Sequence, residues 1–238
     1  MSVRRVRLVR LIVRTFSELC ITVGTVIVTF VVYVLFWTGV KATDAADGQI
    51  DSLREEWVRL PVESPAPAAG EPAPPAPSPK GYVNGKPFAV MYIPRFGAGW
   101  DWPVLEGTST GTLKKGLGHY AATARLGLTG NFSVAGHRRT YGDPFKDFPE
   151  LRPGDAVILN DGTTWFTYRI KQRPYRTVPG DVAVIDPVPG RSGFDGPGRY
   201  LTLTTCDPEW GSSHRLIVWA HLDATRPVTD GKPEAFHS

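Results

Sequence analysis

Cysteine is scarce in this chain of 238 residues, and that scarcity limits the sites it can build. Only Cys20 and Cys206 occur, and Cys20 lies inside an apolar segment near the N-terminus. We therefore expect no disulfide between them. No CxxC or Cys/His pair has the spacing of a zinc site, and no acidic cluster has that of a calcium loop. The sequence thus predicts no metal and no cofactor, and it leaves Cys206 as a free thiol.

Charge is also sparse once the N-terminus is set aside. The formal net charge is +4, but residues 1–47 hold six Lys/Arg against three acidic residues, which leaves only +1 for the remainder. Downstream there is no basic stripe with interleaved aromatic residues of the kind that binds nucleic acid. We therefore expect no nucleic-acid partner, in spite of a sequence pI of about 9.1.

One long uncharged run lies near the N-terminus. Leu19 to Val40 has 22 residues without a charge, and five arginines precede it in segment 1–18. Such a run can cross roughly 30 Å of hydrocarbon as a helix, and the arginines favour a cytoplasmic N-terminus. A cleaved secretory signal is the alternative, because AxA-like residues occur at 42–46, but the run exceeds the ~7–15 residues of a signal core. We expect a single-pass membrane anchor at 19–40, with the remainder outside the cell.

The segment after the anchor cannot build a core of its own. Residues 48–60 can form a short amphipathic helix, whereas 61–80 are rich in proline and alanine, as a semi-rigid spacer is. We predict a stalk at 41–80. At the other end, 227–238 is a polar tail that contains no second span.

Short strand patterns dominate residues 81–226. Gly, Pro and Asp turns separate them, and the Asn160-Asp161-Gly162 turn is typical of a hairpin. Helical patterns are weak and short, at 107–126 and 143–151. About eight strands can close a small barrel and remove exposed edges, so we predict a mostly β domain, a closed β-barrel of about eight strands with short helices. The expected strands are 88–93, 100–105, 131–136, 155–160, 163–170, 181–185 and two within 200–222.

The stretch 200–222 carries the most specific chemical signal. It contains two strand patterns joined by a loop with four turn formers, Pro208, Gly211, Ser212 and Ser213. Antiparallel pairing would place Cys206 opposite Arg215, roughly 5 Å across the ladder. A buried cysteine that merely packs as a small hydrophobe is the alternative interpretation.

His137 supplies the partner that a cysteine nucleophile needs. It follows a predicted strand and a glycine. An imidazole can accept the thiol proton and later donate one to a leaving amine. Arg215 stays protonated, so it cannot be the base, but it can donate hydrogen bonds to a carbonyl or an oxyanion. The other histidines, His119, His214, His221 and His237, are expected to be structural or merely exposed.

These motifs resemble those of the sortases, the cysteine transpeptidases of the bacterial cell surface. TLTTC, the RLIV that follows it, and AGHR upstream carry the resemblance, which covers most of 86–225. GLGHY, AGHRRTYG and TLTTC are most similar to the class E housekeeping sortases, with class D next. Asp207 is a departure, since relatives with this pattern commonly carry His after the cysteine.

The resemblance implies a reaction and a set of roles. Cys206 would be the nucleophile, His137 the acid/base, and Arg215 the residue that binds the oxyanion and the substrate carbonyl. The substrates would be secreted proteins with a C-terminal sorting signal, cut between Thr and Gly and then joined to a peptidoglycan-precursor amine. Two other interpretations stay open. The chain could be an extracytoplasmic cysteine hydrolase that releases its product to water, or a tethered binding module whose cysteine is inert.

The resemblance also implies a preference within the sorting signal. Class E sortases favour LAxTG over LPxTG, a choice attributed to an aromatic side chain in the groove. Tyr120 is the candidate for that side chain and Tyr141 the reserve, although either could simply pack in the barrel. Thr204 and Thr205, next to the thiol, are predicted to line the groove.

Overall fold

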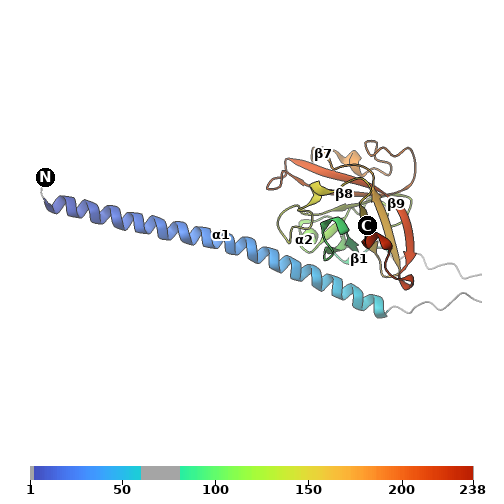
Figure 1. The fold of residues 1–238 in the computed structure, drawn as a ribbon, viewed down its shortest axis with the longest axis horizontal. Coiled ribbons are helices and arrows are strands. Elements are labelled where there is room, and N and C mark those ends of the chain that lie inside the picture. Colours follow the sequence, from blue (N-terminus) through green and yellow to red (C-terminus); the bar gives the residue numbers. More distant parts are fainter. Residues whose placement is uncertain (1–2, 60–80, 238) are drawn as a thin grey trace, which may run out of the picture.

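The computed structural model describes residues 3–59 and 81–237, which form a long helix and a β-domain (Figure 1). The helix, α1, runs from Val3 to Arg59. The Pro/Ala-rich spacer predicted at 61–80 lies outside the described residues.

Eight strands close the β-domain into a barrel. Their order around the wall is β6-β5-β1-β2-β3-β4-β8-β9, and pairing between β6 and β9 closes the ring. The pairs β2–β3 and β4–β8 are parallel, while the others are antiparallel. The closed barrel predicted from the sequence is therefore confirmed. The strands are β1 (Pro87–Tyr92), β2 (Asp101–Glu106), β3 (Leu117–His119), β4 (Gly130–Ala135), β5 (Ala156–Asn160), β6 (Thr164–Ile170), β8 (Arg199–Asp207) and β9 (His214–Pro227).

The set of strands differs from the prediction in three places. The strand expected at 181–185 is wrong, because this segment is a 3-10 helix, η3 (Val182–Ile185), whose Val184 carbonyl accepts hydrogen bonds from the Trp219 indole and the Thr202 hydroxyl. Two three-residue strands, β3 and β7 (Tyr175–Thr177), were not predicted, since so short a segment shows no period. Strand β7 pairs with β9 outside the ring.

The short helices fall where weak helical patterns occur. Helix α2 (Thr110–Leu113) lies within 107–126, and the 3-10 helix η2 (Phe148–Glu150) lies within 143–151. Ser109 caps α2 through its side chain, which accepts a hydrogen bond from the Thr112 amide. Three further 3-10 turns are η1 (Pro94–Phe96), η4 (Val228–Asp230) and η5 (Glu234–Phe236).

The two faces of the barrel wall carry different side chains. Because side chains alternate along a strand, Leu201 and Leu203 of β8 point inward. They join a core that includes Phe132, Leu159, Tyr168 and Val218, all of them 0–1% exposed. A separate apolar cluster covers part of the outer face of β8 and β9, made of Tyr175, Val184, Ile185, Phe194, Ile217 and Trp219.

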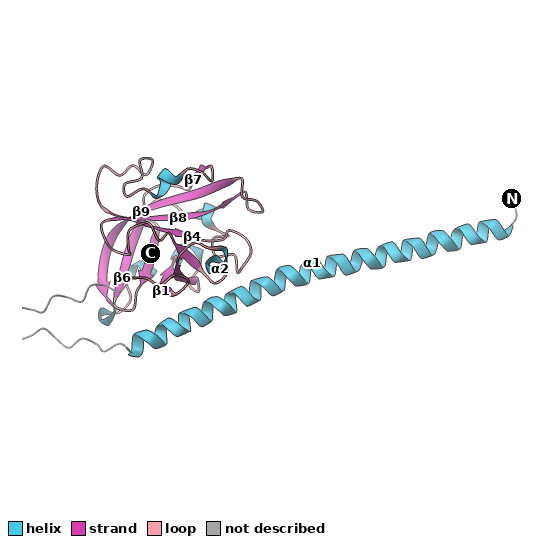
Figure 2. Cartoon of the chain, turned by 180° about the vertical axis from the view of Figure 1, so that it is seen from behind, coloured by secondary structure: helices cyan, strands magenta, loops and turns pink. Residues whose placement is uncertain are grey.

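Helix α1 is longer than the predicted anchor and has two unlike parts. Its stretch from Arg7 to Tyr33 is exposed and is apolar and long enough to cross a membrane. Beyond it, Ala42, Ala46, Ile50 and Leu53 recur at helical spacing and are buried. The helix contacts β1 and β2, and Arg54 pairs with Asp101 at 3.4 Å. Residues 41–59, predicted as the first part of a stalk, thus continue the helix and lie against the barrel (Figure 2).

Candidate active site

The structure places Cys206 and Arg215 directly opposite each other. Strands β8 and β9 pair antiparallel with Cys206 facing Arg215 across the ladder, as the sequence predicted. Thr204 faces Ile217 in the same ladder. Since Ile217 belongs to the outer cluster, alternation puts Thr204, Cys206 and Arg215 on the outer face of the wall. The thiol is therefore outside the core, and it is half-buried.

The strand that leads into His137 lies on the opposite side of β8 from Arg215. Strand β4 runs parallel to β8, with Ala135 level with Thr204. The Gly136 amide donates to the Thr204 carbonyl at 3.1 Å, and the Thr205 hydroxyl donates to the Gly136 carbonyl at 2.9 Å. The backbone that leads into His137 is thus tied to the residues before Cys206. In the sheet, β8 lies between β4, which leads into His137, and β9, which carries Arg215.

The surroundings of His137 favour a neutral imidazole. The side chain is partly buried, and burial, followed by the positive charge of Lys114, lowers its pKa. Its Nε2 atom is buried and makes no hydrogen bond within the part of the chain that is described. The Tyr141 ring lies beside it, with ring centres 5.1 Å apart. A neutral ring nitrogen without a partner can accept a proton from a thiol or an amine.

Arg215 uses one of its nitrogens to hold the loop between β8 and β9. Its Nη1 donates to the carbonyls of Ser212 and His214, each at 2.9 Å. Within the described residues, Nε and Nη2 have no hydrogen-bond partner, so these donors remain for a ligand. A guanidinium with a fixed position and spare donors is suited to hold a carbonyl or an oxyanion.

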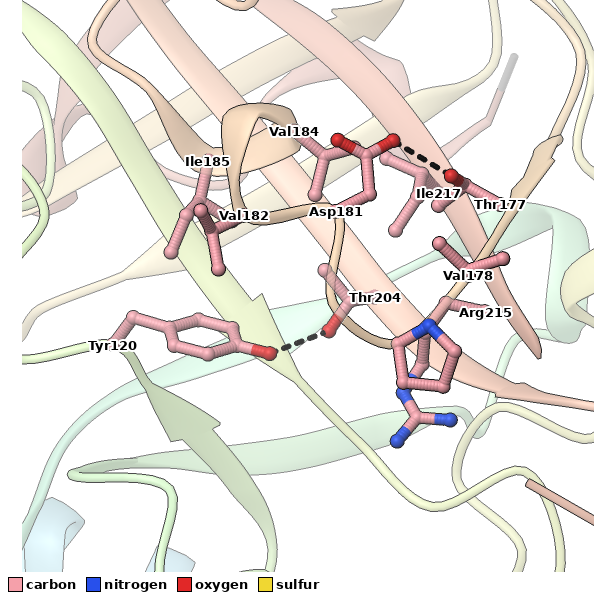
Figure 3. Close-up of a pocket in the computed structure, with 11 residues that line it drawn as sticks. Tyr120, Thr177, Val178, Asp181, Val182, Val184, Ile185, Thr204, Arg215 and Ile217 are labelled. Atoms are coloured by element: carbon pink, nitrogen blue, oxygen red, sulfur yellow. Dashed lines mark hydrogen bonds between the residues drawn. The ribbon is translucent and has the colours of Figure 1, made fainter. Parts of the chain in front are cut away.

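A groove of about 110 Å³ lies beside Thr204 and Arg215 on the outer face (Figure 3). Its walls come from β8, β9, the end of β7, η3 and the residue after β3. The Tyr120 hydroxyl lies 3.1 Å from the Thr204 hydroxyl, and Thr177 donates to Asp181 at 2.6 Å. The groove is lined by Tyr120, Thr177, Val178, Pro179, Asp181, Val182, Val184, Ile185, Thr204, Arg215 and Ile217.

The predicted substrate residues thus separate into three groups. Tyr120 and Thr204 line the groove and contact each other. Tyr141 lies beside His137 rather than in the groove lining. Thr205 is buried on the other face of β8 and is not part of the groove lining. Its hydroxyl donates to the carbonyl of Gly136, the residue before His137.

Comparison with known proteins decides the family. A model of the sortase domain matches residues 91–223, more than half of the chain. The chain belongs to the sortase family. Sortase SrtE1 of Streptomyces coelicolor is 38% identical over 232 residues, which cover 94% of this chain and 61% of that protein. Sortase SrtE2 of the same organism is 33% identical over 222 residues, covering 91% and 84%. The chain therefore spans under two thirds of the length of SrtE1.

Solved structures support the same assignment. Sortase E from Streptomyces avermitilis is 73% identical, with a TM-score of 0.62, and covers 65% of this chain and 99% of that one. Sortase E1 from S. coelicolor, with a tripeptide in its active site, is 42% identical with a TM-score of 0.60, and covers 63% and 96%. Similarity to class D is more distant, since sortase D of Bacillus subtilis matches only 37% of this chain. The sequence resemblance to class E is confirmed.

A cluster of charged side chains next to Cys206 of this sortase was not predicted. Asp207 accepts hydrogen bonds from Arg138 at 2.5 Å and from Arg176 at 2.6 Å. Burial would raise the pKa of Asp207, but the hydrogen bonds from Arg176 and Arg138 outweigh it and lower that pKa. Arg138 directly follows His137, and Arg176 lies opposite Leu216 in the β7–β9 ladder. Asp207 therefore ties the loop after His137 to β7 across the end of β8.

Two sequence signals pointed toward this cluster without revealing it. Arg138 is adjacent to the predicted acid/base, and Asp207 replaces the histidine common in relatives. Arg176 carried no signal, because it belongs to an unpredicted strand. His119, expected to be structural, is buried with its Nδ1 2.6 Å from a Glu106 carboxylate oxygen and its Nε2 3.1 Å from the Ala124 carbonyl.

Proposed function

We propose that this chain is a membrane-anchored transpeptidase that cleaves a C-terminal sorting signal of the LAxTG or LPxTG type between Thr and Gly. It joins the cleaved protein to the amine of a lipid-linked peptidoglycan precursor. One observation supports the proposal: Cys206 lies opposite Arg215 on the outer face beside a groove, and the neighbouring strand β4 leads into His137. Membership of a family of cysteine transpeptidases supports it.

The first half-reaction forms a thioester. The Cys206 sulfur attacks the threonine carbonyl carbon while His137 accepts the thiol proton. The carbonyl oxygen becomes an oxyanion, and the spare Arg215 donors stabilise it. The C–N bond to glycine then breaks, and His137 returns the proton to the departing amine. The product is a thioester between Cys206 and the threonine, and the peptide that begins with glycine leaves.

The second half-reaction transfers the acyl group. The amine of the precursor attacks the thioester carbonyl, and His137 accepts a proton from that amine. The C–S bond breaks, the Cys206 thiolate leaves, and a new amide bond joins threonine to the acceptor. His137 then returns its proton to the thiolate, and the enzyme is restored.

Tyr120 is the proposed specificity residue for the second position of the signal. Its ring lies in the groove and its hydroxyl meets Thr204, two residues before the nucleophile and on the same face (Figure 3). An aromatic wall at this place suits a small alanine, which is the preference that the class E resemblance implies. We expect Tyr120→Ala to reduce the preference for LAxTG over LPxTG.

The test uses the full chain with LAxTG and LPxTG peptides, a soluble amine and mass spectrometry. The proposal predicts a new amide product with the amine and a larger yield from LAxTG. If the free acid of the cleaved peptide is the sole product, even at high amine concentration, the chain is a hydrolase. No cleavage, together with a Cys206 thiol that resists alkylation near neutral pH, would identify a binding module.

We also propose a topology. The arginine-rich segment 1–18 lies in the cytoplasm, α1 spans the membrane once, and residues 81–238 lie on the extracellular face. The exposed apolar stretch of α1 supports this arrangement. Protease added to intact, wall-stripped cells should digest the barrel and spare an N-terminal tag. Protection of the barrel would contradict this topology.

A further inference from the structure

Contacts with α1 fix which end of the barrel faces the apolar part of that helix. The segment 137–145 closes on itself, since the Phe145 amide donates to the His137 carbonyl at 3.0 Å. Within this loop, a β-carbon added to Gly142 would lie 3.3 Å from the Thr43 hydroxyl of α1. The loop that begins at His137 therefore touches α1 near Thr43.

The opposite end of the barrel meets the other end of the docked helix. A β-carbon added to Gly162, in the turn between β5 and β6, would collide with the Trp57 indole. Along α1, Thr43 precedes Trp57, and the apolar stretch Arg7–Tyr33 precedes both. The end of the barrel that carries His137 and Cys206 thus faces the apolar stretch, and the β5–β6 turn faces away from it.

The loop between β8 and β9 projects in the same direction. In both views, the hairpin that β8 and β9 form reaches toward the N-terminal part of α1 (Figures 1 and 2). Trp210 lies in this loop and is 70% exposed. It is the only exposed Trp, Tyr or Phe side chain among residues 81–237, since the other exposed large hydrophobic side chains there are Val83, Leu128, Val178 and Val182.

The loop holds this tryptophan in place rather than leaving it free. The Arg139 guanidinium stacks over the Trp210 ring at 5.1 Å from its centre, and Arg139 also pairs with Glu209 and Asp143. The indole is therefore presented to solvent from a loop that ion pairs connect to the loop after His137. An exposed, preorganised indole is typical of a binding surface.

The spacing along α1 suits contact with a bilayer. The uncharged run of α1 ends at Val40, three residues before Thr43, which corresponds to about 4.5 Å of helical rise. The headgroup layers extend a membrane from about 30 Å of hydrocarbon to about 40–45 Å in total, so one layer is deep enough to cover that gap. The β8–β9 loop, which projects in the same direction, would lie at this level.

We propose that Trp210 docks the β8–β9 loop into the headgroup layer of the membrane that α1 spans. Tryptophan favours this layer because its ring is apolar while its N–H can still meet polar groups. The catalytic end would then open onto the membrane surface, where a lipid-linked amine can reach the thioester without leaving the bilayer. The docking rests on the anchoring proposed above, and the acceptor delivery rests on the proposed transpeptidation.

The test places the full chain in phosphatidylcholine vesicles that contain a lipid with a nitroxide in its headgroup. Emission of Trp210 is obtained as the difference between wild type and Trp210→Phe. We expect the nitroxide lipid to remove most of this emission. Trp57→Phe is the matched control, because Trp57 lies at the far end of the barrel. The emission of Trp57, obtained by the same subtraction, should be equal with and without the nitroxide lipid. Equal Trp210 emission with and without the nitroxide lipid would overturn the docking.

A kinetic comparison separates the docking from the chemistry. Trp210→Ser should lower turnover with a lipid-linked amine in the same vesicles and leave turnover with a soluble amine unchanged. If wild type shows quenching but cleaves no peptide, the transpeptidase proposal fails and the docking stands. If quenching is absent and Trp210→Ser instead slows cleavage of a sorted protein, Trp210 binds that protein and the docking is wrong.

Discussion

The two faces of strand β8 divide stability and chemistry between them. The inner side chains, Leu201 and Leu203, are fully buried in the barrel core. On the outer face, Thr204 lines the groove and Cys206 is half-buried opposite Arg215. A one-residue step along the strand therefore moves a side chain from the packing of the fold to the chemistry of the site. Substitutions on one face should affect stability, and those on the other activity.

The outer face of β8 is only partly covered, which leaves room for a site. The 3-10 helix η3 lies over β8 and β9, where Trp219 and Thr202 both bond to the Val184 carbonyl. This cover gives the groove a wall near Thr204 and leaves the end of β8 open. Asp207 and its two arginines then hold the loops at that open end.

Removal of the thiol tests the outer face directly. Cys206→Ala should abolish peptide cleavage, because the proposed thioester cannot form without the sulfur. Its unfolding transition should stay close to that of the wild type, since the thiol lies outside the core. Cys20→Ala, which alters the other cysteine in α1, is the control and should retain activity. Turnover of Cys206→Ala above a blank without enzyme would rule out the covalent mechanism.

Arg215 tests whether the outer face uses hydrogen bonds or only charge. Arg215→Lys keeps the charge but loses the planar donors, so we expect kcat for the sorting peptide to fall by about 10²–10³. Arg215→Ala should be nearly as poor, and both variants should still react with an alkylating reagent at Cys206. The measurement is kcat/KM beside the alkylation rate. A lysine variant within about threefold of wild type would mean that charge alone suffices.

Leu203 gives the reciprocal test on the inner face. Leu203→Ala removes a fully buried side chain and should lower the free energy of unfolding by about 2–5 kcal/mol. At temperatures where the variant remains folded, kcat/KM should stay close to the wild-type value. Denaturant unfolding and peptide cleavage are measured on the same sample. Unchanged stability with lost activity would contradict the division between the two faces.

A smaller change is expected in the pH dependence of activity that reports the protonation of His137. Lys114 is one of the two causes that lower the His137 pKa, the larger being burial. Lys114→Gln removes a positive charge that disfavours the imidazolium, so the His137 pKa should rise and the limb of the kcat/KM profile that reports it should move to higher pH. Lys115→Gln, which alters the neighbouring lysine, is the control. A shift to lower pH would contradict this sign.

Much of the fold and the site could be predicted from local patterns. The alternation of Leu and Thr before Cys206 and the apolar run after Arg215 predicted two strands, and the loop between them set the register that brings these residues together. The Asn160-Asp161-Gly162 turn likewise predicted the pairing of β5 with β6. Such features need only a few neighbouring residues. The roles of His137, Cys206 and Arg215 in catalysis stay predictions.

Short or apolar segments could not be assigned in this way. Residues 181–185 are apolar enough for a strand, yet η3 forms there because contacts with Thr202 and Trp219 hold its backbone over the barrel. Strands β3 and β7 have three residues each, and only their partners in the sheet define them. Tertiary contacts outweigh local preference at these places.

Periodicity, length and turn chemistry are local properties, and they were enough to predict about eight short strands, an apolar helix before them, and a cysteine opposite an arginine. The other contacts exist only in the folded chain: α1 lies against the barrel, Tyr120 meets Thr204, and Asp207 joins Arg138 to Arg176. Each of these contacts joins residues far apart in the chain. Their pairing depends on how the strands close around one core, which no short segment encodes.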